Sequence, residues 1–135
     1  MNAIKERTCE ELVYGEWQSR RADFSSYMLR ADENDELGPW HEYGLGFDYV
    51  APDTFEGQYE GYFRYQLSWG GPSQEIRFFA DPSFSIHRIE FWHLNWFDGA
   101  SVDITEDEAA QWIVDDFEAC DMFRSAFELA AERDQ

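Results

Sequence analysis

The stretch DENDELG, at residues 32–38, places four carboxylates within five positions. Oxygen ligands at this density are typical of a calcium-binding loop, which also needs a glycine at its sixth position and a glutamate at its twelfth. Counting from Asp32, the sixth position holds Leu37 and the twelfth holds Tyr43. The spacing therefore does not support a calcium site, and we expect this stretch to act through its charge.

The histidines and cysteines lack the spacing that metal sites and nucleophilic enzymes use. His87 and His93 share one strand parity but lie six residues apart, and His41 is remote from both, whereas structural zinc ligands come in closely spaced pairs. Cys9 and Cys120 have no CxxC spacing and no catalytic signature around them. We therefore expect no metal ion, no cofactor, no catalytic residue and two free thiols.

Two further patterns in the sequence could indicate a catalytic or ligand-binding site. The glycine-rich stretch WGGPS, at residues 69–73, lacks the lysine and the following helix of a phosphate-binding loop, so a hairpin turn explains it better. Paired carboxylates can hydrolyse a glycosidic bond, but a chain with 29 acidic residues always places some pair close together. An enzyme acting on a small molecule stays an alternative, and it would need a deep pocket among the sheet aromatics.

The strongest signal is a net charge of −19 in 135 residues, from 29 acidic and ten basic residues. Such a charge repels nucleic acids and acidic membrane surfaces and attracts basic partners, so we exclude direct binding to nucleic acid. The acids gather in two tracts: residues 31–60 hold nine acids and no base, and residues 105–135 hold ten acids and two arginines. This clustering, with 19% aromatic residues, argues against adaptation to high salt as the cause.

The sequence shows no signal that would direct the chain to a membrane or out of the cytoplasm. The opening residues, MNAIKERTCEEL, are polar and charged and lack the apolar segment of a signal peptide. No apolar run approaches the roughly 18–20 residues that a membrane helix needs. We therefore expect a cytoplasmic chain that does not associate with a membrane.

A helix is predicted at the start of the chain, over residues 8–31. Thr8 and Glu11 have the spacing of a capping box, and apolar residues then follow at helical intervals. The pattern stops in an acidic loop over residues 32–39. Arg20 falls inside the apolar stripe of this helix, where a charged residue needs a partner.

The period changes to that of strands over residues 40–104. Apolar and polar residues alternate in short runs that are separated by tight turns, which predicts an antiparallel meander of four to five strands. The apolar parity switches between Phe91 and Trp92, which indicates either a β-bulge or burial on both faces of the sheet. The fold class is therefore α+β, a single domain in which this sheet is flanked by an N-terminal and a C-terminal helix.

The second helix is predicted over residues 105–133, with Thr105 and Glu108 as its capping box. Asp116 falls inside its apolar stripe, and we expect it to pair with Arg20 or each of the two to meet a charged residue of the sheet. The stripe contains these residues: Ala109, Trp112, Ile113, Phe117, Cys120, Phe123 and Phe127.

The opposite side of this helix carries carboxylates with apolar side chains among them, namely Val114, Met122 and Leu129. Apolar groups inside a charged rim are typical of the centre of a protein interface. The side chains expected to bind a partner belong to the acidic loop and to this outer helix face: Asp32, Glu33, Asp35, Glu36, Asp107, Asp115, Glu118, Asp121 and Met122.

The segment YFRYQLSWGGPSQEIRFF, followed by IEFWHLNWFDGAS, resembles a family of small uncharacterised proteins carried by bacterial plasmids and phages. The similarity covers roughly residues 60–101, and the family transfers no catalytic residue. It implies a mobile-element context, in which small acidic proteins block host defences. Among these are DNA-mimicking inhibitors of restriction and CRISPR complexes.

We therefore expect a non-enzymatic inhibitor of the anti-CRISPR or anti-restriction type, either a monomer or a homodimer. Its carboxylate tracts would imitate a nucleic-acid backbone and occupy the basic groove of a defence nuclease or surveillance complex, whose lysines and arginines normally bind phosphates. An immunity protein that neutralises a nuclease toxin would use the same electrostatics and stays an alternative.

Overall fold

The structure, a computed structural model, describes residues 7–30 and 36–133. Five antiparallel strands form one sheet in the order β1-β2-β3-β4-β5, which confirms the predicted α+β meander. The strands are β1 (Gly46–Val50), β2 (Tyr62–Ser68), β3 (Ser73–Ala80), β4 (Ile86–Asn95) and β5 (Asp98–Asp103). The helices are α1 (Cys9–Leu29), the short 3-10 helix η1 (Trp40–Glu42), α2 (Glu108–Ala119) and α3 (Met122–Arg133).

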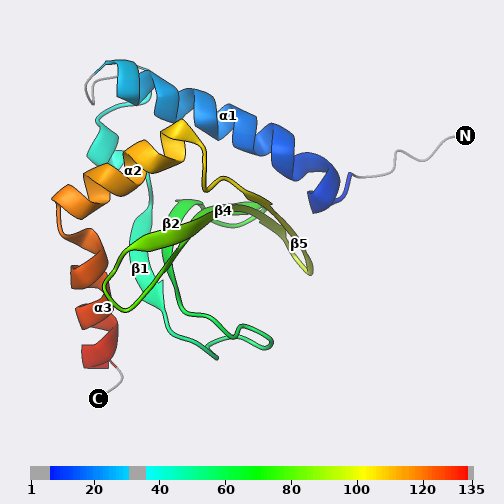
Figure 1. The fold of residues 1–135 in the computed structure, drawn as a ribbon. Coiled ribbons are helices and arrows are strands. Elements are labelled where there is room, and N and C mark those ends of the chain that lie inside the picture. The colour runs from blue at the N-terminus through cyan, green and yellow to red at the C-terminus, as the bar shows by residue number, and fades with distance from the viewer. Residues whose placement is uncertain (1–6, 31–35, 134–135) are drawn as a thin grey trace, which may run out of the picture.

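The three long helices lie on one face of the sheet (Figure 1). Helix α1 packs against β4 and β5, α3 packs against β1, and α2 contacts both other helices. The sheet curves away from the helices, so its other face is concave, and the connection between β1 and β2 lies opposite this face (Figure 1). Within the described residues, no helix combines the length and the hydropathy needed to span a membrane.

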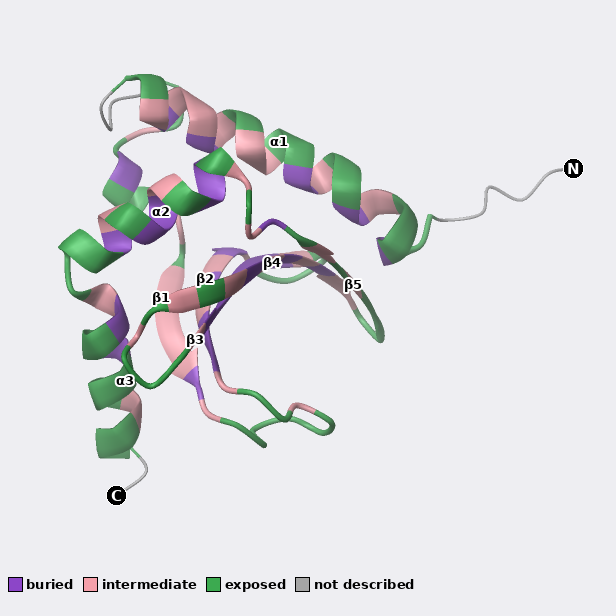
Figure 2. Cartoon of the chain, in the orientation of Figure 1, coloured by how far each residue is buried: buried purple, intermediate pink, exposed green. Residues whose placement is uncertain are grey.

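The core between helices and sheet is mainly aromatic, because alternate residues of each central strand point toward the helices. In Figure 2 the buried positions of α1 and α2 lie on the sides that face the sheet. The strands supply these core side chains: Phe63, Tyr65, Leu67, Ile76, Phe78, Ile89 and Phe91. The helices and η1 supply Val13, Trp17, Phe24, Tyr27, Trp40, Ile113, Phe117 and Phe123.

The start of α1 is as predicted. Thr8 is the N-cap, its side chain accepts from the backbone N–H of Glu11, and the Glu11 carboxylate accepts from the backbone N–H of Thr8. This capping box satisfies two of the backbone donors that a helix start leaves free.

The prediction of one helix over residues 105–133 is wrong. The chain turns between α2 and α3 at Asp121, which has a φ of 55° in the left-handed region. Because the turn redirects the chain, Cys120 is exposed at the turn and Phe127, beyond it, is partly exposed. Val114, expected on the outer side, is buried on α2 beside Ala110 and Phe117.

The predicted capping box at the start of this segment is also wrong, because the N-cap of α2 is Asp107. Its side chain accepts from the backbone N–H of Ala109 at 2.8 Å. The hydroxyl of Thr105 instead donates to Asp103 and accepts from the backbone N–H of Ile89, so it ties the end of β5 to β4.

The parity switch in β4 reflects packing on both faces of the sheet. The β4–β5 ladder runs in register from Glu90 to Asn95 without a bulge near Phe91 and Trp92. Phe91 is buried under the helices, while Trp92 is half-buried on the concave face. Of the two explanations that the sequence left open, burial on both faces is the one observed.

Candidate functional site

Three of the nine predicted partner-binding residues, Asp32, Glu33 and Asp35, lie outside the described residues. Glu36 is exposed in the connection that leads from α1 to η1. This connection is followed by Trp40, whose indole N–H donates to Asp116 on α2 at 2.9 Å. The first acidic tract therefore approaches α2 through Trp40.

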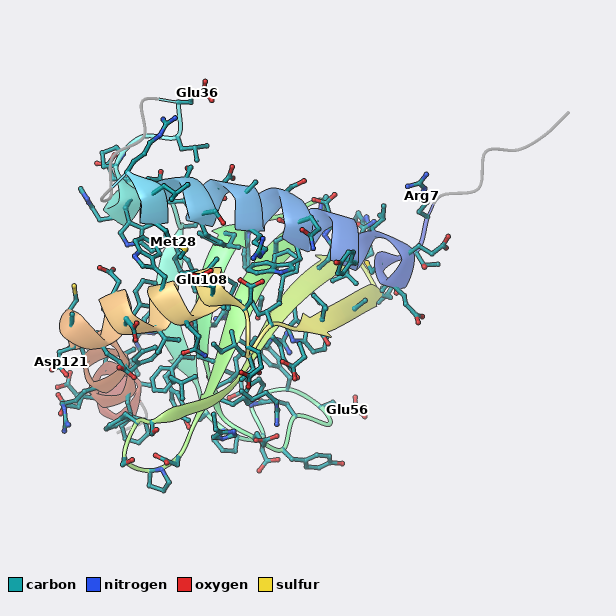
Figure 3. All side chains as sticks on the ribbon, turned by 45° about the horizontal axis from the view of Figure 1, so that its top comes forward. Arg7, Met28, Glu36, Glu56, Glu108 and Asp121 are labelled. Carbon is teal, nitrogen blue, oxygen red and sulfur yellow. The ribbon has the colours of Figure 1, made fainter. Side chains whose placement is uncertain are left out.

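The remainder of the first tract is not brought to α2. Asp48 lies on the concave face of the sheet, where it binds Arg64. Glu56 and Glu60 belong to the β1–β2 connection, and Figure 3 shows Glu36 and Glu56 at opposite sides of the molecule. Among the residues that the structure describes, the two acidic tracts therefore do not merge into one continuous surface.

Asp107 has a structural role in the fold. One of its carboxylate oxygens caps α2, and the other accepts from Nε of Arg21 on α1 at 2.7 Å. The half-buried carboxylate thus joins the two helices, and neither oxygen is left for a partner.

The other predicted residues of this segment lie on and beside the outer face of α2. Asp115, Glu118 and Asp121 are exposed, and within the described part of the chain neither Asp115 nor Glu118 has an ion-pair partner. Asp121 lies 3.6 Å from Nε of the exposed Arg124. Met122 is only half-exposed because it packs against the core. In Figure 3, Glu108 and Asp121 mark the two ends of α2. We call Asp115, Glu118 and Asp121 the acidic face of α2.

The two charged residues in the apolar stripes do not pair, so that expectation is wrong. Arg20 donates through Nε to Gln74 at 2.7 Å and through Nη1 to the hydroxyl of Tyr43 at 3.0 Å. The carboxylate of Asp116 accepts the hydrogen bond from the indole N–H of Trp40. Each residue has found an uncharged polar partner, which the sequence spacing alone does not reveal.

A polar network continues from Arg20 beneath α1. The buried Gln74 amide donates to Glu16 at 3.0 Å and lies 3.1 Å from Nδ1 of the buried His93. The hydroxyl of Tyr43 donates to the carboxylate of Asp23 at 2.6 Å. Burial of the phenol raises its pKa, and this hydrogen bond raises the pKa further. A cavity of about 370 Å³ borders the network. These hydrogen bonds join α1 to β3, β4 and the residue after η1, so the network holds α1 on the sheet.

Two adjoining cavities of about 530 and 450 Å³ lie on the concave face, and both are lined by Phe55, Tyr62 and Arg77. Arg77 is stacked between the rings of Tyr62, at 4.6 Å, and Trp92, at 4.0 Å. Its Nε donates to Glu75 at 2.8 Å. The charged residues of this face form ion pairs with one another, Asp48 with Arg64, Glu75 with Arg77 and Glu90 with Arg88. The sequence reasoning missed the aromatic cavities around them. Strand parity was the available signal, since Tyr62, Arg77 and Trp92 all alternate with core residues.

The described residues contain no group of three or more histidine, cysteine or carboxylate side chains that could hold a metal ion. Comparison of the chain with protein-family models, with curated proteins and with solved structures finds no match.

Proposed function

We propose that this protein is a non-enzymatic inhibitor that binds the basic nucleic-acid-binding groove of a host-defence nuclease or surveillance complex in place of nucleic acid. The acidic face of α2 carries this proposal. Asp115 and Glu118 lie three residues apart on α2, so their side chains leave the helix roughly 5–6 Å apart, and Asp121 follows in the turn after the helix. A basic groove that receives one duplex charge per about 1.7 Å of helix axis can accept such a row.

The position of these acids on α2 is unfavourable for the helix itself. Like charges three residues apart destabilise a helix by roughly 0.2–0.5 kcal/mol per pair. Glu118 also lies in the last turn, where the helix dipole favours a cation, and this turn has no basic residue. A sequence under selection for stability alone would place lysine or arginine there. The presence of acids at positions that are unfavourable for the helix supports a role in binding.

The acidic face is also held in a fixed geometry. Val114 and Phe117, which directly precede Asp115 and Glu118 on α2, are buried in the core, so the backbone that carries these two carboxylates cannot reorient without unpacking the core. Charges that are already arranged cost less entropy on binding. Glu36 and Glu42, both exposed near η1, extend the same electrostatic attraction.

The test is a charge reversal on α2 with a control of equal net charge. The test variant combines Asp115→Lys, Glu118→Lys and Asp121→Lys. The control variant combines Glu10→Lys, Glu128→Lys and Glu132→Lys, which are exposed acids on α1 and α3.

The wild type should retain basic nucleic-acid-binding proteins from host lysate at about 50 mM NaCl and release them at about 500 mM, where the Debye length is several-fold shorter. The test variant should lose these partners and their inhibition, while the control keeps most of both. Equal retention by the test variant would refute the proposal. A secreted nuclease toxin as the retained partner would replace it with the immunity function.

A further inference from the structure

Exposed aromatic side chains surround the open, concave face of the sheet. Trp96 is 92% exposed, Phe97 is fully exposed, and Trp69 is 73% exposed. Phe55 and Tyr59, from the β1–β2 connection, are also exposed, and Figure 2 shows the β4–β5 tip and most of this connection as exposed. Phe55, Trp69 and Trp96 line one cavity, and Phe55 and Tyr59 line the adjoining one. We call these five residues the aromatic rim.

The β4–β5 turn shows that the rim is not an accident of loop sequence. Trp96 and Phe97 are the two residues between Asn95 and Asp98, which pair across the ladder. Trp96 has a φ of 56°, a left-handed conformation that favours glycine or asparagine and is unfavourable for a bulky residue. A turn of this length needs no tryptophan, so its presence points to contacts outside the chain.

The tip is also anchored. A carboxylate oxygen of Asp98 accepts from the backbone N–H of Cys9 at 2.7 Å, which joins the turn to the first residue of α1. The rings of Trp96 and Phe97 are therefore held on a fixed backbone. Rigid aromatic anchors are the residues that contribute most to the centres of protein interfaces.

The size of the rim matches a protein interface. At roughly 150–250 Å² for each aromatic side chain, the five exposed fractions sum to about 800 Å². A standard interface uses about 800 Å² per partner, whereas the largest apolar patch on a typical monomer is about 300–600 Å².

The charges of this face identify the partner. The walls of the two cavities carry the arginines 64, 77 and 88 against the glutamates 56, 60, 75 and 90, and Asp48 on the same face pairs with Arg64. The excess of acids on this face is therefore small for a chain of net charge −19. A basic partner is attracted more strongly by the acidic face of α2, so it would not select this face. Two copies can meet here with little local repulsion, and the arginines of one can pair with the glutamates of the other.

We propose that the aromatic rim and the concave sheet face form the interface of a symmetric homodimer. In an isologous contact each copy offers the same patch, so each rim covers the concave face of the other copy. The helices lie on the opposite face of the sheet (Figure 1), and the dimer therefore leaves both α2 acidic faces exposed.

Sedimentation velocity over a concentration series tests the dimer. The wild type should form dimers, and the dimer fraction should increase between about 50 and 500 mM NaCl, because screening weakens the repulsion between two acidic chains. The double variant Trp96→Gly, Phe97→Asn gives the turn residues that its conformation favours, so it should fold and stay monomeric. The control Tyr14→Ser, Leu29→Ser removes two exposed apolar side chains from α1 and should dimerise as the wild type does.

The dimer would be overturned by a wild type that stays monomeric at every concentration and salt, or by a Trp96→Gly, Phe97→Asn variant that dimerises normally. A monomer whose tryptophan fluorescence responds to a neutral oligosaccharide such as maltohexaose would assign the rim to a small ligand and would equally overturn it. Binding of the basic partner should weaken with salt and depend on α2, whereas the dimer should strengthen with salt and depend on Trp96 and Phe97. The failure of one proposal is therefore distinguishable from the failure of the other.

Discussion

Phe117 and Phe127 belong to the same apolar stripe in the sequence, but the structure gives them different environments. Phe117 is 4% exposed, and its ring lies 5.1 Å from the rings of both Phe47 and Tyr65, centroid to centroid. Phe127 is 41% exposed, with Tyr49 at 5.0 Å on the edge of the core. Replacing each by alanine measures this difference.

We expect Phe117→Ala to lower the free energy of unfolding by about 4 kcal/mol, within the range of about 3–5 kcal/mol for buried phenylalanines. Burial of roughly 150–250 Å² at about 25 cal/mol per Å² gives a similar value before the alanine methyl group is subtracted. Phe127→Ala removes a ring that water already reaches on one side, and its expected cost is about 1–2 kcal/mol. The difference between the two variants should therefore exceed about 2 kcal/mol.

Urea titration followed by far-UV circular dichroism gives both free energies, provided that the slope of the unfolding free energy against urea concentration is the same in the variants and the wild type. Leu129→Ala is the control, because this exposed leucine of α3 should change stability by less than about 0.5 kcal/mol. Equal losses for the two phenylalanine variants would refute the division of the segment into α2 and α3, since one continuous stripe would bury both rings alike.

Two further predictions concern residues at either end of the fold. Backbone and side-chain hydrogen bonds from Cys9 hold the pKa of the Asp98 carboxyl below its usual value. The ionised Asp98 therefore stabilises the fold fully above the unfolded-state pKa of about 3.9, and this stabilisation is lost as the pH falls through the lower folded-state pKa. Thermal melts between neutral and acidic pH should show a smaller acid-induced drop for Asp98→Asn than for the wild type, and parallel curves would contradict this. Burial raises the pKa of the Cys9 thiol, whereas Cys120 is exposed, so a disulfide reagent should modify one thiol rapidly in the folded protein and the second only in urea. Rapid modification that persists in Cys120→Ser would contradict the burial of Cys9.

The fold was predictable where local signals and periodicity agree. Thr8 and Glu11 define the start of α1 by themselves, and the alternation in residues 62–68 defines β2. The turn at Asp121 was not predictable in the same way, because it contains neither glycine nor proline and the apolar spacing continues through it. Aspartate tolerates the left-handed conformation better than most residues, so the sequence carries only a weak signal of the break.

The candidate surfaces were predictable only in part. The acids Asp115 and Glu118 lie on the exposed side of a helix, as their spacing indicated. Trp69 and Trp96, in contrast, continue the apolar parity of the strands before them, so periodicity alone places both residues in those strands. In the structure β2 ends at Ser68 and β4 ends at Asn95, so Trp69 and Trp96 lie just after the strands, in the connections that follow. Their exposure depends on where each strand stops, which periodicity does not determine.

The hydrogen bond between Cys9 and Asp98 joins residues that are 89 positions apart, and this separation has a consequence for synthesis on the ribosome. Helix α1 leaves the ribosome first, yet its apolar side packs on β4 and β5, which are completed only at Asp103. At 5–20 residues per second, translation from the end of α1 to that point takes roughly 4–15 s. During this interval Trp17 and Phe24 have no sheet to pack on, so the nascent chain presents an aromatic helix that chaperones can bind before the fold closes.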